Sequence, residues 1–175
     1  PNTVDLGTDT RQFKDLYLSG GVVFGDAGGS GTSSSNSLDS YEEGTWTPVV
    51  SDANSAGNLG SASVLNNFYT KIGRQVTVTC TLNNIVNTGL TGGNSLFIQG
   101  LPFTSSGSNY SVGPVRSDTV NYSATRSTMV CQIAGSDTWI SFNVSGTNAT
   151  DRNITPADIT SGTSDIALSI TYITA

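Results

Sequence analysis

The alternation of apolar and polar side chains with a period of two is the feature that most constrains the fold of this chain. In residues 76–82 the apolar positions are Val76, Val78, Cys80 and Leu82, and threonines stand between them. A period of two places each set on one face of a β-strand, so this segment predicts a strand with one buried face and one polar face.

Similar short runs recur from Thr45 onward, separated by turns rich in Gly, Asn, Ser and Pro. The expected strands are residues 45–50, 64–72, 75–85, 95–101, 111–120, 127–134, 139–144 and 165–173. Their spacing is typical of a β-sandwich or jelly roll. One helical turn is expected at residues 155–159, where Pro156 follows a capping threonine. The predicted fold class is therefore all-β.

Composition supports many short strands and excludes some classes of partner. Ser, Thr, Asn and Gly number 25, 24, 15 and 20 of 175 residues, which suits strands with polar outer faces and frequent turns. The net charge of −6 would repel a phosphate backbone, so nucleic acid is not an expected partner. No apolar run reaches the 18 residues of a membrane span, so membrane insertion is not expected either.

The sequence offers little support for a catalytic site. The chain has no histidine, which excludes His-based triads and most transition-metal sites. Adjacent Glu42 and Glu43 point to opposite faces of an extended chain, and the aspartates of the second half fall in predicted turns or strand ends. Cys80 and Cys131 are expected to be buried thiols rather than a disulfide. We therefore expect no catalytic residue, no metal site and no cofactor, and the chain is not expected to be an enzyme.

Three blocks occur in a specific order within the first 48 residues. They are residues 4–8 (VDLGT), 13–21 (FKDLYLSGG) and 41–48 (YEEGTWTP). In this order they resemble the C-terminal part of bacteriophage tail fibres and tailspikes, where the first two blocks resemble a shaft element and the third opens a terminal globular domain. The resemblance implies a virion protein that binds a host surface.

The resemblance also implies a division of the chain into three parts. We expect a shaft or trimerisation segment at residues 1–25, a Gly/Ser linker and junction at 26–44, and a globular β-sandwich head at 45–175. The shaft segment is too short to bury both of its faces within one chain. The family implies that three copies wind around one axis and complete each other's core, giving an interwoven homotrimer. The alternative is a short hairpin packed on the head.

Sugars present apolar C–H faces and hydroxyls, so a site that binds them pairs an exposed aromatic ring with short polar side chains. The alternation in residues 139–144 places Trp139, Ser141 and Asn143 together on the more polar face of a strand. This face is a candidate carbohydrate platform. The alternative is that Trp139 packs against a neighbouring subunit or covers the edge of the barrel.

Four further residues are candidates for glycan binding. Tyr110 and Tyr122 lie at junctions between loops and strands, where they would add aromatic rings to such a surface. Arg116 and Asp118 lie on the same face of their strand and form either a polar clamp or a surface ion pair.

These observations favour the receptor-binding tip of a tail fibre, which attaches the virion to host cell-surface polysaccharide or lipopolysaccharide by multivalent, non-catalytic binding. The expected partners are further copies of the chain and other virion tail proteins. The expected location is the virion tail fibre, assembled in the host cytoplasm. One alternative is a structural trimerisation cap or virion junction without a receptor site. Another is a glycan depolymerase, which needs two carboxylates in an open groove.

Overall fold

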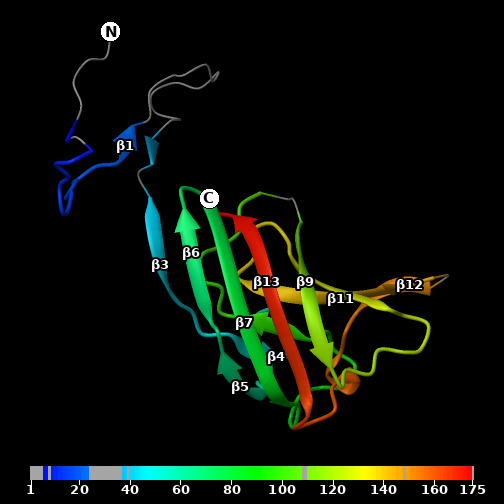
Figure 1. The fold of residues 1–175 in the computed structure, drawn as a ribbon. Helices are drawn as coiled ribbons and strands as arrows, with labels where there is room; N and C mark the ends of the chain where they lie inside the picture. The colour runs from blue at the N-terminus through cyan, green and yellow to red at the C-terminus, as the bar shows by residue number, and fades with distance from the viewer. Residues whose placement is uncertain are drawn as a thin grey trace. The chain divides into compact units, whose positions relative to one another are not determined.

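The computed structural model describes residues 6–7, 9–23, 37–38, 40–107, 110–147 and 149–174 (Figure 1). It divides into two compact units, Pro1–Asp39 and Ser40–Ala175. Most of the expected Gly/Ser linker, residues 26–36, lies outside the described residues. The second unit begins a few residues before the expected head because the block at residues 41–45 pairs into its sheet.

The first unit contains one small ladder, in which β1 (Val22–Val23) pairs antiparallel with β2 (Ser37–Leu38). All large apolar side chains among its described residues are exposed, and Tyr17 is 91% exposed. These side chains are Leu6, Phe13, Leu16, Tyr17, Leu18, Val22, Val23 and Leu38. A single copy therefore has no core in the described part of this unit. The interwoven arrangement of copies remains a prediction.

The second unit is built from antiparallel strands, which confirms the all-β prediction. Its strands are β3 (Tyr41–Thr45), β4 (Val49–Ser51), β5 (Ser61–Leu65), β6 (Phe68–Ile72), β7 (Gln75–Val86), β8 (Phe97–Gln99), β9 (Ser111–Asp118), β10 (Thr128–Ile133), β11 (Trp139–Gly146), β12 (Ala149–Asn153) and β13 (Ser164–Ile173). They form one sheet in the order β3-β6-β7-β13-β9-β10-β11-β8-β4, with β5 beside β7 and β12 beside β11. The expected helical turn is a 3-10 turn, η1 (Pro156–Asp158).

The sheet curls at β9, because this strand pairs with both halves of the sheet. Residues 111–114 of β9 pair with β10, and residues 115–118 pair with β13. In Figure 1, β7, β13 and β9 run side by side while β11 crosses behind them. The two ends of the strand order, β3 and β4, are joined by only three residues, and Gly60 next to β5 donates a 2.9 Å hydrogen bond to the Val50 carbonyl in β4. The result is a curled half-barrel around one core.

The core lies between the two halves of the sheet. The predicted inward residues of β7, from Val76 to Leu82, are buried, as are Ile140, Phe142 and Val144 of β11. Cys80 and Cys131 are both buried free thiols, as expected. Burial raises the pKa of Cys80 to about 12 and that of Cys131 to about 11, so both stay neutral in the core. Among the described residues no helix is long and apolar enough to cross a membrane.

A buried carboxylate organises the loop after β4. The side chain of Asp52 accepts hydrogen bonds of 2.8 Å from the Thr91 backbone N–H, 2.8 Å from the Asn58 backbone N–H and 2.9 Å from the Asn58 amide. Asp52 is only 3% exposed. The hydrogen bonds from Thr91 and Asn58 lower the pKa of Asp52 to about 2. The ionised form is therefore the one that the loop stabilises.

We expect Asp52→Asn to lower the free energy of unfolding at pH 7. The difference from wild type is expected to become progressively smaller at acid pH. A lowered pKa contributes stability above the ordinary carboxyl value of 3.8, and that contribution is lost as pH falls toward about 2. The measurement is urea unfolding of both proteins at pH 7, 4 and 2.5, with the exposed Asp151→Asn as the control. A stability difference between wild type and Asp52→Asn that stays constant across this range would contradict the assignment.

Candidate ligand-binding groove

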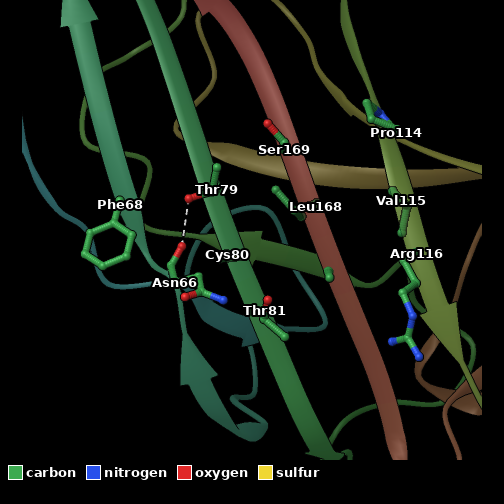
Figure 2. Close-up of a pocket in the computed structure, with 11 residues that line it drawn as sticks. Asn66, Phe68, Thr79, Cys80, Thr81, Pro114, Val115, Arg116, Leu168 and Ser169 are labelled. Carbon is green, nitrogen blue, oxygen red and sulfur yellow. Dashed lines mark hydrogen bonds between the residues drawn. The ribbon is translucent and has the colours of Figure 1, made fainter.

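A shallow groove of 680 Å³ crosses the solvent-facing side of β6, β7, β13 and β9 (Figure 2). We call it the β7/β13 groove and define it by Phe68, Thr79, Thr81, Ala167, Ser169 and Arg116. In Figure 2, Phe68 lies at one side, Arg116 lies at the other, and the small side chains of β7 and β13 lie between them.

The floor of the groove consists of short side chains that the alternation places outward. Thr79 lies directly opposite Ser169, and Thr81 lies directly opposite Ala167. The Thr79 hydroxyl donates a 2.8 Å hydrogen bond to the Asn66 carbonyl, whereas the hydroxyls of Thr81 and Ser169 have no hydrogen-bond partner in the described part of the chain. The floor therefore offers hydroxyl donors and acceptors to a ligand.

Phe68 reaches the groove because the strand predicted at residues 64–72 is interrupted. That prediction was wrong in detail, since the segment forms β5 and β6 with a bulge between them. Leu65 pairs with Thr81 and Tyr69 pairs with Val78, so residues 66–68 oppose only residues 79–80. The extra residue shifts the alternation by one position. Phe68 therefore faces solvent with 56% exposure, whereas Tyr69 packs partly buried against the core.

The bulge is held in place by Trp46 and by the backbone of Asn66. Asn66 adopts a φ of 54°, in the left-handed region that asparagine tolerates better than most residues. Trp46 and Asn67 are joined by two hydrogen bonds, 3.0 Å from the Trp46 N–H to the Asn67 carbonyl and 2.6 Å from the Asn67 amide to the Trp46 carbonyl. The Trp46 indole also donates a 2.9 Å bond to the Thr79 carbonyl. Trp46 thus has a structural role.

The opposite wall carries Arg116, one of the residues that the sequence singled out, whereas its neighbour Asp118 does not line the groove. Arg116 and Asp118 project from the same face of β9, and a guanidinium nitrogen of Arg116 lies 3.5 Å from a carboxylate oxygen of Asp118. Their side chains are 68% and 57% exposed. The surface ion pair is thus present, and an exposed pair of this kind contributes little to stability. Among the residues that the structure describes, Arg116 is the one charged residue that lines the groove.

The structure places Trp139, Ser141 and Asn143 on the other half of the sheet. Trp139 is partly buried and packs edge-on against Phe97 of β8, with ring centroids 4.9 Å apart and an interplanar angle of 83°. Ser141 is only 2% exposed. This face offers a ligand less than the alternation alone indicates, because Ser141 at its centre is buried and the Trp139 ring packs against Phe97.

Tyr110 and Tyr122 lie at opposite ends of β9. Tyr110 is 68% exposed, while Tyr122 packs partly buried against the core. The eight residues of β9 span about 23 Å, seven steps of about 3.3 Å, so the two rings do not share a binding site. Of the seven sequence candidates, only Arg116 lines the groove, and Asp118 is its ion-pair partner. The residues missed were Phe68 and the hydroxyls of its floor, and the Asn66-Asn67 pair inside an alternating run was the signal for the bulge.

The groove has the chemistry of a binding surface. Within the described ranges no group of three or more His, Cys, Asp and Glu side chains is placed to hold a metal ion. An aromatic ring, a hydroxyl floor and an arginine are the groups that bind polar ligands with apolar faces. Comparison of the chain with protein-family models, with curated proteins and with solved structures found no match.

Proposed function

We propose that this chain is the receptor-binding tip of a phage tail fibre and that the β7/β13 groove binds a glycan of the host cell surface without cleaving it. The observation that carries the proposal is the 56% exposed ring of Phe68 beside the hydroxyls of Thr81 and Ser169, which have no hydrogen-bond partner among the described residues. A pyranose ring has an apolar face that stacks on an aromatic ring, and its hydroxyls pair with short polar side chains.

The proposal includes a homotrimer with jelly-roll-like heads. The exposed apolar side chains of the first unit support it, because they need a partner to leave water. Three copies of a shallow groove on one particle bind a repetitive polysaccharide more tightly than any one of them does. Once one groove has bound the polysaccharide, the other two grooves bind it intramolecularly, at a high effective concentration.

The test is the binding of fluorescently labelled protein to a panel of bacterial strains before and after periodate oxidation of their surface glycans. We expect saturable binding that is lost on oxidation. We expect Phe68→Ala to weaken it by about tenfold, the effect of removing one stacking ring and its buried area.

The matched control for Phe68→Ala is Tyr110→Ala, which removes an exposed ring outside the groove. Circular dichroism establishes that both variants remain folded. If the two variants bound cells equally well, the groove would not be the binding site. If binding survived periodate oxidation, the ligand would not be a glycan.

A second candidate function is a structural cap or virion junction with no receptor site. It is favoured by a row of outward side chains at one end of the same face, where Tyr41, Ile72 and Ile173 are 61%, 49% and 43% exposed. The register places them in one row across the sheet. In this row Tyr41 pairs with Ile72, and Gln75 lies between Ile72 and Ile173. An apolar row of this kind suits another protein surface. Absence of cell binding by a correctly assembled protein would favour this function.

A further inference from the structure

We propose that the ligand of the β7/β13 groove is an anionic saccharide whose carboxylate or phosphate group binds Arg116 while one of its sugar rings stacks on Phe68. This inference rests on the proposed glycan-binding function and specifies the class of glycan. The chain carries a net charge of −6, yet the charged residue that lines the groove is a cation. Charge complementarity therefore points to an anionic group on the ligand.

Arg116 keeps free donors for such a group. Its guanidinium has five N–H donors, and its one ion-pair contact in the described structure is the 3.5 Å approach to Asp118. The side chain is 68% exposed, so a ligand reaches it without displacing protein groups. Carboxylate and phosphate are the two groups that match the planar guanidinium with paired hydrogen bonds. Asp118 would then position the guanidinium.

Two neighbouring carboxylates define where the anionic end of the ligand stops. Asp118 lies directly opposite Asp165 on β13. This pair lies on the same face of the sheet as Arg116 and Ala167, two residues further along β9. The Asp165 carboxylate accepts a 2.8 Å hydrogen bond from the Asn84 backbone N–H. An anionic group placed beyond Arg116 would meet these like charges. The two carboxylates therefore favour binding of the ligand's anionic group at Arg116 and exclude its binding further along β9.

The separation of the two walls sets the minimum length of the ligand. Phe68 is on β6 and Arg116 is on β9, with β7 and β13 between them. Three strand spacings amount to about 14 Å. This exceeds one sugar ring, so the ligand has at least two linked sugars and lies across the strands. The hydroxyls of Thr81 and Ser169 lie under its middle.

The test uses an array of immobilised bacterial capsular polysaccharides and lipopolysaccharides. Each anionic glycan is present intact, after chemical reduction of its carboxylates to alcohols, after dephosphorylation, and after both treatments. We compare wild type with Arg116→Gln and with Arg74→Gln, which removes the same charge from an exposed turn outside the groove. We expect the bound glycans to be anionic. We expect Arg116→Gln to weaken their binding by about tenfold or more, the loss of a charge-assisted hydrogen bond, with Arg74→Gln close to wild type.

The chemically treated glycans identify which anionic group is bound. Loss of binding on carboxyl reduction assigns a uronic or similar acid, and loss on dephosphorylation assigns a phosphate. Equal binding of intact and doubly treated glycans, or equal effects of the two arginine variants, overturns this inference. It leaves the proposed function standing if Phe68→Ala still weakens binding. Failure of the folded protein to bind any glycan overturns both.

Discussion

Replacement of Gly113 by alanine is expected to destabilise the second unit by about 3 kcal/mol, the upper part of the usual range for overpacking a core. Gly113 pairs with Cys131 of β10, two residues before Val115, where the pairing of β9 with β13 begins. A Cβ at this position would lie 2.5 Å from the Ser169 carbonyl oxygen, 2.9 Å from the Ile170 Cβ and 3.0 Å from the Cys131 sulfur. The first two belong to the backbone and Cβ of β13, so β13 itself must move.

The physical reason is the curl of the sheet. Glycine within a strand often marks a tight bend or a close approach of another backbone. Here the two halves of the sheet converge on the inner side of β9, and a side chain at Gly113 would separate them. The expected effect is therefore on the whole fold and not on one local contact.

The matched control is Gly93→Ala, because no atom lies within 4 Å of a Cβ at that position. Urea unfolding followed by tryptophan fluorescence gives the free energy of unfolding for both variants. We expect the Gly93 variant to stay within about 0.5 kcal/mol of wild type, as surface substitutions usually do. Equal unfolding midpoints for the two variants would show that the sheet accommodates a side chain at its bend.

The sequence was sufficient to predict the all-β class and the inward faces of β7 and β11. The alternating apolar side chains of residues 76–82 and 140–144 are all buried on one face of their strands, so the period of two predicted these inward faces directly. The expected ion pair of Arg116 and Asp118 followed from the same rule, because residues two apart share a face.

The grouping of the strands was not predictable in the same way. The strand β3 follows a Gly/Ser-rich stretch and pairs with residues 68–72, a contact that no local pattern indicates. The place of β9 between both halves of the sheet also depends on pairing between distant segments. For this reason Tyr110, Tyr122 and Trp139 looked equally suited to one surface, although the fold separates them.

The groove depended on a single extra residue. In an uninterrupted strand from Val64 to Ile72, the parity would turn Phe68 toward the core. The bulge at Asn66 shifts the alternation by one residue, so Phe68 faces solvent instead. Trp46 belongs to the YEEGTWTP block, so its hydrogen bond with Asn67 connects this block to the bulge and to the position of Phe68.

Replacement of Asp158 by alanine is expected to cost about 2 to 3 kcal/mol, somewhat below the usual loss on breaking a buried ion pair because Arg152 is partly exposed. Asp158 is 7% exposed, and both of its carboxylate oxygens lie 2.7 Å from nitrogens of the Arg152 guanidinium. It also accepts a 2.8 Å hydrogen bond from the backbone N–H of Thr155, which caps η1. One carboxylate thus joins β12 to η1.

The same contacts give the prediction a pH dependence. Burial by itself would raise the pKa of Asp158, but the hydrogen bonds from Arg152 and Thr155 and the charge of Arg152 outweigh it, so the pKa is lowered. A lowered pKa contributes stability above the ordinary carboxyl value of 3.8, and the contribution is lost as pH falls through the folded-state pKa. The difference between wild type and Asp158→Ala is therefore expected to shrink in acid.

A double-mutant cycle with Arg152→Met separates the ion pair from the cap. Once Asp158 is gone, Arg152 has lost its partner, so the double variant is expected to be less destabilised than the sum of the two single variants. Unfolding in urea at pH 7 and pH 3 measures all four proteins. Additive losses at pH 7 would show that Asp158 acts through the cap at Thr155 alone. A coupling that persists at pH 7 and fades at pH 3 would assign the junction of β12 and η1 to the ion pair, because that coupling requires the ionised carboxylate.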